Sequence, residues 1–538
     1  MRHLEKPKWQ KTFEQKHGQK RKFWLGLIGV FVFILVFIPV IIGLFFGFRN
    51  YAFTESLSVE GATIVVKAGG DFQAALNRAK SGDTIILPAG AAFVGSFTLP
   101  KKTGSEFITV QSSELPKLPK DGVRVSPKDA ALMPKILSSG KNEPALLTSS
   151  GAHHYRFIGV EFSVSKPDDD AWKVIYIGDD VQSKPEQVPH DIVFDRCYVH
   201  GHKEQTGTVR SGLSINGSRI EIVNSYISDF RLTDDEAQAI VAWNAPGPFK
   251  IINNYIEAAG ENVLFGGATA HKGMNPADLE FRHNHLAKPL EWRGKYKVKN
   301  IFELKDMRRA VIEENVFENN WASGQDGTAI LFTPASFESG PDARVEDIVF
   351  RSNIVRKTAN AITMTGTDYG DKNYPNIPVQ NRNVRFENNL FGEIGGSWGD
   401  KSAGRFLLLT SGAGPDNLTL DHNTIQNSGT LMMLDGGPLK NFVFTNNIGN
   451  HNEYGIIGTG KASGAIGSVA LKAYTNGMTF RKNVIIGADA ARFPADNFYQ
   501  PRLSEPAAYK NRATDGKDLG CDLIALSAME KKVVAGIK

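Results

Sequence analysis

The segment IFELKD, residues 301–306, carries two ionisable side chains whose spacing could support chemistry. Glu303 and Lys305 are two positions apart, so in a β-strand they project from the same face, about 6.6 Å apart along the strand. An acid and an amine held this close could exchange protons with a substrate. Arg308 and Arg309 follow at once and could neutralise a negative charge. The alternative is an ion-pair ladder on the surface of a sheet.

These residue types fit one reaction class in particular. A polysaccharide lyase acting on a uronic acid must neutralise the carboxylate, remove the proton at C5 and help the leaving oxygen depart, which requires a cation, a base and an acid. A lysine can act as the base only if its pKa is lowered, and Arg308 and Arg309 would lower the pKa of Lys305 whereas Glu303 would raise it. Calcium is a further candidate for the cation, but no acidic cluster stands beside this strand, so the metal remains unknown.

Four other residues could line the same site and contact substrate. Trp243 and Trp321 could stack on sugar rings, although an aromatic side chain often covers core instead. His271 and Asp326 fall in loops that precede or follow neighbouring strands, so both could overhang Lys305. The alternative for each loop residue is a solvated side chain with no role in binding.

The strands that would position these residues follow from a period of two. The segments AIVAWN (239–244), NVLFGG (262–267), IFELKD (301–306), AILFTP (329–334) and AITMTG (361–366) align with one another. Alternate apolar positions point inward in this alignment, which predicts outward pairs at Val241/Trp243, Leu264/Gly266, Glu303/Lys305, Leu331/Thr333 and Thr363/Thr365. Glu303 and Lys305 then lie beside the small Gly266 and near Trp243.

A second pattern recurs along the chain and indicates the architecture. The motif, in which an Asn follows a short alternating strand, occurs at 249–256, 279–286, 310–317, 348–355, 384–391, 418–425, 442–449 and 478–485, with degenerate copies at 155–162, 192–199 and 220–227. Each unit is too short to bury a face alone, so eleven units predict a solenoid whose turns share one core. Stacked Asn side chains would hydrogen-bond along the axis, so we assign them a structural role only.

The start of the solenoid has its own signature. DFQAALNRAKSGDTIILPAGAAF (71–93) predicts a short amphipathic helix, a Gly-Asp turn and a strand at 84–87. This segment resembles the pectate-lyase-like right-handed parallel β-helix superfamily, in which a capping helix precedes a G-D-T-I-x-L strand. The resemblance covers about residues 63–525 and implies the fold. It does not imply one activity, because the superfamily includes lyases, hydrolases, epimerases, adhesins and noncatalytic surface proteins.

A shorter resemblance concerns the candidate site itself. The ELKD strand followed by a turn is similar to the lysine-bearing strand of the chondroitinase B and alginate lyase family. That resemblance implies that Lys305 is the base and that Arg308 or Arg309 is the acid or the carboxylate clamp. It covers only a few residues.

The first 62 residues predict a membrane anchor. Residues 1–22 carry eight basic and two acidic side chains, residues 23–48 contain no charge, and residues 49–62 form a linker. An apolar run of this length spans a bilayer as a helix, and the basic tail places residues 1–22 in the cytoplasm and the rest outside. The alternative is a cleaved signal peptide. Because the net charge of +5 includes +6 from this tail, the remainder has no basic footprint for nucleic acid.

These observations together predict an all-β, right-handed parallel β-helix of about eleven recognisable turns with an N-terminal capping helix, preceded by one transmembrane helix. The solenoid spans 63–525, residues 114–145 interrupt it as an excursion loop, and a cap or tail follows at 526–538. The predicted function is an extracytoplasmic protein that binds polysaccharide and cleaves uronic-acid glycans by β-elimination. The alternative is a noncatalytic surface or envelope protein that binds carbohydrate or has a structural role.

Overall fold

The computed structural model describes residues 61–367, 379–400, 402–410, 412–500 and 506–535. The predicted cytoplasmic tail, the apolar run at 23–48 and nearly all of the linker lie outside these residues. Within the described part of the chain, no helix is long and apolar enough to cross a membrane.

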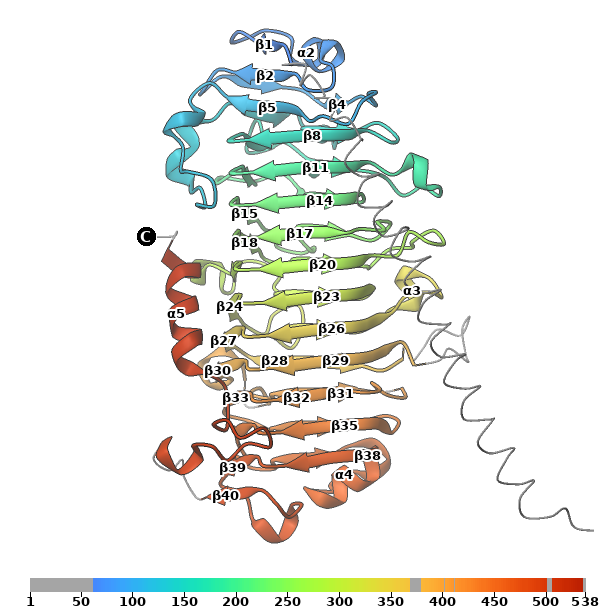
Figure 1. Ribbon diagram of the computed structural model, residues 1–538, viewed down its shortest axis with the longest axis vertical. Coiled ribbons are helices and arrows are strands. Elements are labelled where there is room, and N and C mark those ends of the chain that lie inside the picture. Colours follow the sequence, from blue (N-terminus) through green and yellow to red (C-terminus); the bar gives the residue numbers. More distant parts are fainter. Residues whose placement is uncertain (1–60, 368–378, 401, 411, 501–505, 536–538) are drawn as a thin grey trace, which may run out of the picture. The chain divides into compact units, whose positions relative to one another are not determined.

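The described chain winds into a parallel β-helix with three long sheets (Figure 1). Sheet A has fourteen strands within the described residues: β1 (Thr63–Val65), β2 (Thr84–Leu87), β5 (Ile108–Ser112), β8 (His153–Ile158), β11 (His190–Asp195), β14 (Ser218–Val223), β17 (Phe249–Ile252), β20 (Ala277–Arg282), β23 (Met307–Glu313), β26 (Val345–Arg351), β29 (Asn381–Glu387), β32 (Thr419–Asp421), β35 (Leu439–Thr445) and β38 (Thr475–Arg481). Each strand pairs in parallel with the strand of the next turn, as in a right-handed β-helix.

Two further sheets complete each turn. Over the same described residues, sheet B contains β3 (Ala92–Val94), β6 (Lys135–Ser138), β9 (Glu161–Val164), β12 (Tyr198–His200), β15 (Tyr226–Phe230), β18 (Tyr255–Ala258), β21 (His285–Ala287), β24 (Val316–Asn320), β27 (Ile354–Thr358), β30 (Leu390–Ile394), β33 (Thr424–Asn427), β36 (Ile448–Asn450), β39 (Val484–Ile486) and β40 (Phe498–Gln500). Sheet C contains β4 (Phe97–Leu99), β7 (Leu146–Thr148), β10 (Ala171–Ile177), β13 (Val209–Ile215), β16 (Gln238–Ala242), β19 (Glu261–Phe265), β22 (Phe302–Leu304), β25 (Thr328–Phe332), β28 (Asn360–Thr365), β31 (Leu407–Thr410), β34 (Met432–Leu434) and β37 (Ile456–Gly458).

The repeat predicted from the sequence is confirmed strand by strand. The eleven motif copies begin the sheet A strands from β8 to β38, and each motif continues into the following sheet B strand. The structure adds β1, β2 and β5 in front of them. These earlier turns have no Asn at the motif position, and neither do the three degenerate copies on β8, β11 and β14.

The Asn column is a continuous ladder of buried polar side chains along the solenoid. Asn315 accepts hydrogen bonds at Oδ1 from the backbone N–H and the side-chain amide of Asn284, at 2.8 and 3.1 Å, and Asn353 accepts the same pair from Asn315. The pattern runs to Asn483, which in turn donates to Asn497. Every motif Asn is fully buried, so the predicted structural role is confirmed.

Helices pack against the core of the solenoid and along one of its sides. Helix α2 (Phe72–Arg78) begins at Asp71, whose carboxylate accepts from the Ala74 N–H at 2.8 Å, and it buries Phe72, Ala75 and Leu76, which confirms the predicted cap. Helix α4 (Ser468–Tyr474) buries its apolar side in the core near the other end. The short helix α3 (Ser336–Ser339) follows β25.

The C-terminal segment, which was predicted as a cap or tail, is largely helical. Helix α5 (Leu523–Val534) lies along the side of the solenoid, where Leu526, Met529 and Val533 pack against Val316 and Ile354 of sheet B (Figure 1). Its apolar face covers sheet B side chains that would otherwise be exposed.

The predicted excursion loop is also only partly a loop. Residues 115–132 form two 3₁₀ helices, η1 (Leu115–Lys117) and η2 (Pro127–Leu132), but β6 (Lys135–Ser138) is a regular strand of sheet B. Arg124 in this loop donates to the backbone oxygens of Asn253 and Val533. The other short helices are η3 (Pro185–Gln187), η4 (Leu290–Trp292), η5 (Gly396–Trp398), η6 (Gly460–Ala462), η7 (Ala490–Arg492) and η8 (Pro506–Tyr509).

Candidate functional site

A groove of about 590 Å³ lies on the outer surface of sheet C, and we call it the sheet C groove. Its side chains come from β10, β13, β16 and β19, and from the loops that follow β22 and β25. Basic, acidic and aromatic groups all contribute, namely Lys173, Arg210, Lys299 and Lys305, then Asp180, Glu236 and Glu338, then Trp172 and Trp243.

The period of two in the sheet C strands builds this surface as predicted. Val241 pairs in register with Leu264, and Leu264 with Glu303, so all three occupy one outward column. Val241, Trp243 and Leu264 form a small apolar cluster on the outside of the sheet. Trp243 is 7% exposed, so most of its ring is covered by protein.

Glu303 and Lys305 lie together, as the strand alignment predicted. The Glu303 side chain is 1% exposed, and its Oε1 is 3.6 Å from the Lys305 Nζ. Lys305 also forms an ion pair with Glu338 of α3, which is half-buried. Gly266 lies beside Lys305 with φ near +92°, and a Cβ there would come within 2.9 Å of the Lys305 Cβ, so this position favours glycine.

The pKa shifts of Glu303 and Lys305 differ from the expectation that nearby arginines lower the pKa of Lys305. Burial alone would lower the pKa of Lys305, but the negative charges of Glu303 and Glu338 outweigh it and the pKa is raised. Burial raises the pKa of Glu303 to about 7, while the charge of Lys305 opposes this shift. The free protein therefore holds Lys305 as a cation, and Glu303 is the group whose proton is released near neutral pH.

Glu303→Gln is expected to change how stability depends on pH. Because the folded-state pKa of Glu303 lies above its ordinary value of 4.5, its proton stabilises the fold fully below pH 4.5, and this contribution is lost as pH rises through about 7. Glutamine has no such proton, so the free energy of unfolding of Glu303→Gln relative to wild type should increase from about pH 5 to about pH 8. Urea unfolding followed by circular dichroism measures this difference. A difference that does not vary with pH would contradict the expectation.

A second ion-pair network lies beside the first. Lys299 contacts Glu261 at 2.8 Å and Glu236 at 3.0 Å, and Gln238 donates to Glu261 at 3.1 Å. Burial would lower the pKa of Lys299, but these carboxylates raise it. Glu236, Glu261, Glu303 and Glu338 thus each face a lysine ammonium. A calcium ion would have to displace these lysines, so the groove does not fit calcium and we derive no step through it.

Lys173 is in a different environment from the other two lysines. Its Nζ lies 4.2 Å from the centre of the Tyr176 ring and 5.3 Å from that of Trp243. Burial lowers the pKa of Lys173, while the charge of Asp180 opposes this shift and that of Arg210 adds to it. Asp180 also lines the groove, but among the described residues no carboxylate forms an ion pair with Lys173 within 4.0 Å. Nearby, Trp172 is 48% exposed beneath the Arg210 guanidinium. A cation without a paired anion and an exposed ring are both suited to hold a charged sugar.

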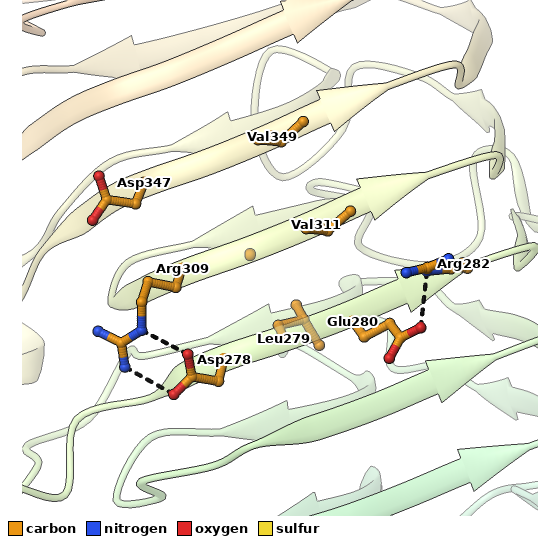
Figure 2. Close-up of a pocket in the computed structure, with 9 residues that line it drawn as sticks. Asp278, Leu279, Glu280, Arg282, Arg309, Val311, Asp347 and Val349 are labelled. Atoms are coloured by element: carbon orange, nitrogen blue, oxygen red, sulfur yellow. Dashed lines mark hydrogen bonds and ion pairs between the residues drawn. The ribbon is translucent and has the colours of Figure 1, made fainter. Parts of the chain in front are cut away.

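Arg308 and Arg309 are not brought to the groove. Between Asp306 and Met307 the chain turns the corner from sheet C to sheet A, so both arginines belong to β23. Figure 2 shows Arg309 on the outer face of sheet A, where its Nε contacts Asp278 at 2.6 Å. Arg308 lies 3.8 Å from Glu346 of the same sheet. The expectation that these arginines would lower the pKa of Lys305 is therefore corrected.

Arg309 has a left-handed backbone conformation, which it shares with its neighbours in the adjacent turns. Its φ is 57°, and its neighbours in the adjacent turns, Asp278 and Asp347, have φ of 60° and 59°. These residues form a column of left-handed conformations at the corner that leads into sheet A. The ion pair with Asp278 links two turns within that column.

The other predicted contact residues are spread over the surface. His271 lies at the rim of the groove, where its Nε2 is 3.1 Å from the Asp180 backbone oxygen. Asp326 pairs with Arg405 and is not among the residues that line the groove. Trp321 is 2% exposed in a cluster with Trp292, so it serves the packing of loops and offers no free ring.

Comparisons with known proteins find similar solved structures at low sequence identity. No protein-family model matches the sequence, and no curated protein matches it. Among solved structures, an alginate lyase from Paenibacillus sp. str. FPU-7 is 16% identical with a TM-score of 0.38, over 67% of this chain and 93% of that one. A mannuronic acid specific polysaccharide family 6 lyase from human gut microbiota is 10% identical with a TM-score of 0.41, over 88% and 99%.

A surface protein is similar to the same degree. The adhesin PfbA of Streptococcus pneumoniae is 9% identical with a TM-score of 0.42, over 80% of this chain and 87% of that one. These likenesses concern the fold alone. The three parallel sheets of the described residues themselves confirm the predicted parallel β-helix.

Proposed function

We propose that the sheet C groove binds an acidic polysaccharide. The observation that carries the proposal is the position of Lys173, a partly buried cation that faces the groove above two aromatic rings. Asp180 acts on it from a distance, but among the described residues no carboxylate forms a direct ion pair with it. A uronate carboxylate would supply the missing anion. The exposed ring of Trp172 would contact a sugar of the same chain, since aromatic faces pack well on pyranose rings.

Lys305 supplies a second position for a carboxylate. Its present partner Glu338 comes from α3, a helix of four residues on a loop, and the Glu338 side chain is 34% exposed. A sugar carboxylate could take the place of Glu338, because both groups bring one negative charge to the Lys305 ammonium. Glu338 thus holds the ammonium in position in the free protein and competes with an acidic ligand.

A binding screen tests this proposal. The purified full-length protein would be titrated with polymannuronate, polygalacturonate, a sulfated glycan and a neutral glucan, with tryptophan fluorescence as the readout. We expect binding of the acidic polymers that weakens with added salt, because exposed ion pairs are screened. Lys173→Gln should weaken it, whereas Lys67→Gln on the exposed N-terminal turn should not. Equal binding of the neutral glucan would contradict the acidic substrate class.

A second candidate function, cleavage by β-elimination, is favoured by the raised pKa of Glu303 next to Lys305. When a substrate covers the pair, a proton would pass from Lys305 to Glu303 and leave a neutral amine. The amine removes the C5 proton, the C5–H electrons form the C4=C5 double bond, and the C4–O4 bond breaks. The new ammonium then protonates O4, and Glu303 returns its proton to Lys305, which restores the starting state.

The noncatalytic alternative makes a different prediction for the same samples. A surface or envelope protein that only binds carbohydrate would retain the acidic polymer without forming a double bond. Ultraviolet absorbance of the unsaturated product separates these cases. Binding without product would support the binding protein and exclude the lyase.

We also propose that the solenoid is extracytoplasmic and anchored by residues 23–48. The support is the eight basic side chains before the uncharged run, against Arg49 as the basic residue close behind it. Protease added to intact cells is expected to degrade the solenoid while a tag at residue 1 survives. Loss of the tag with an intact solenoid would show the opposite orientation. Release of the solenoid by salt alone would exclude a membrane anchor.

A further inference from the structure

A cluster of imidazoles lies on sheet A near its N-terminal end, away from the sheet C groove. His153 and His154 begin β8, while His190 and Asp191 begin β11, the strand of the next turn. His153 and His190 pair in register, and their rings stack with centres 4.8 Å apart and 3° between planes. Two neighbouring turns of the solenoid therefore bring three imidazoles and one carboxylate to the same place.

The backbone fixes the direction of two of these side chains. His154 and Asp191 have φ of 58° and 54°, in the left-handed column at the corner leading into sheet A. His154 Nε2 lies 3.8 Å from Asp191 Oδ2, and His190 Nδ1 lies 2.6 Å from the same oxygen. The ligand atoms of these three residues all lie within 4.8 Å of one another.

Hydrogen bonding shows which nitrogen of His154 is free. The Nδ1 atoms of His153 and His154 are 2.7 Å apart, so one of them carries a proton and donates it to the other. If His154 Nδ1–H is the donor, its Nε2 lone pair faces Asp191. In a tetrahedral site, a nitrogen and an oxygen that each lie about 2.1 Å from the ion are about 3.4 Å apart. The His154 Nε2 and Asp191 Oδ2 are 3.8 Å apart, close to this value, whereas the His190 Nδ1 is hydrogen-bonded to the same oxygen at 2.6 Å and would have to move away from it when an ion binds.

We propose that His154, His190 and Asp191 bind a divalent transition-metal ion of the zinc type, with His153 as the residue that orients His154. Two imidazole nitrogens and one carboxylate oxygen are a donor set that suits zinc, cobalt or nickel and does not suit calcium, which takes oxygen ligands. A hydrogen bond from the far nitrogen of a ligating histidine is the usual way to fix its tautomer. This site is independent of the glycan groove, because it lies on another sheet.

Arg219 would compete with a metal ion for the carboxylate of Asp191. It makes two contacts with Asp191, from Nε to Oδ1 and from Nη2 to Oδ2, both at 2.7 Å. The Arg219 side chain is 52% exposed, so it can swing into solvent when an ion binds. Its positive charge opposes a divalent ion, and removing that charge should tighten metal binding.

The test is a titration of the full-length protein, purified with a tag that contains no histidine, with zinc chloride and cobalt chloride. We expect one equivalent of zinc to bind, visible absorption of bound cobalt typical of a nitrogen and oxygen site, and no heat with calcium chloride. His154→Ala and Asp191→Asn should each weaken zinc binding at least about tenfold, since even indirect partners of a metal contribute that much. Arg219→Gln should strengthen it.

His283→Ala is the matched control, because His283 is also a partly exposed histidine paired with a carboxylate, Glu314, at a corner of the solenoid. It should bind zinc as the wild type does. Asparagine tolerates the left-handed backbone conformation of residue 191, so we expect Asp191→Asn to fold as the wild type does. Circular dichroism checks this. The proposal is overturned if the wild type takes up no zinc, or if Asp191→Asn and His154→Ala bind it as tightly as the wild type.

Discussion

Lys305→Ala is expected to abolish turnover of a uronic-acid polymer, with a loss of at least about 100-fold, the range typical of a missing proton-transfer group. The structure gives the reason, since Lys305 is the groove-lining residue that contacts both Glu303 and Glu338. Without its amine, the C5 proton has no acceptor at this position. Product formation measured by ultraviolet absorbance, with kcat and KM determined separately, checks the result.

Glu338 and Arg308 provide the controls for this experiment. Glu338→Gln removes the carboxylate that competes for Lys305, so it should tighten binding of an acidic glycan, opposite in sign to Lys305→Ala. Arg308→Ala removes a cation three residues from Lys305 in sequence but on sheet A, so it should leave both kcat and KM unchanged. Turnover that survives Lys305→Ala undiminished would exclude the lyase mechanism, whereas loss of turnover in Arg308→Ala would restore the arginine to the site.

We do not expect Lys305→Ala to lose activity through unfolding, although removing a buried charge often destabilises a protein. Removing one partner of a buried ion pair leaves the other uncompensated and is strongly destabilising if that group stays charged. Glu303 has a raised pKa, so it can take up a proton and become neutral when Lys305 is missing. Lys305→Ala should therefore remain folded at neutral pH, and its thermal unfolding midpoint would show this.

The outward pair at Glu303 and Lys305 was predictable because it depends on local periodicity. A strand alternates its side chains, and the apolar residues on either side fixed which face is buried. The partners that set the charge of the pair were not predictable in this way. Glu338 lies 33 residues further along in a short helix, and Lys173 reaches the same groove from four turns earlier. Their positions depend on loop lengths and on the stacking of turns.

Arg308 and Arg309 show why a short motif can mislead. They follow Lys305 closely in sequence, but a β-helix changes direction at each corner, and the corner after Asp306 sends them to another sheet. A motif that crosses a corner therefore does not define one site. The repeat motif avoids this difficulty, because it always marks the corner from sheet A to sheet B. Its eleven copies, eight of which contain the Asn, locate eleven of the fourteen sheet A strands in the described part of the chain.

Asn353→Ala is expected to destabilise the solenoid by about 3 kcal/mol, because several buried polar groups lose their partners at once. The Asn353 Oδ1 accepts from the Asn315 backbone N–H at 2.9 Å and from its side-chain amide at 3.0 Å. Its own amide donates to the Ile312 backbone oxygen at 2.8 Å and to the Asn389 Oδ1 at 3.3 Å. Alanine removes all four bonds, and the fully buried site offers no water to replace them.

Asn476→Ala is the matched control, since Asn476 is exposed on β38, outside the column, and should change stability by less than about 0.5 kcal/mol. Urea unfolding measures both variants. Glycan binding per folded molecule should be unchanged in Asn353→Ala, because Asn353 lies at the corner between sheets A and B and the groove is on sheet C. A variant of normal stability that has lost glycan binding would contradict the structural role. A loss of stability with intact binding would show that the column holds the turns together while the sheet C side chains contact the ligand.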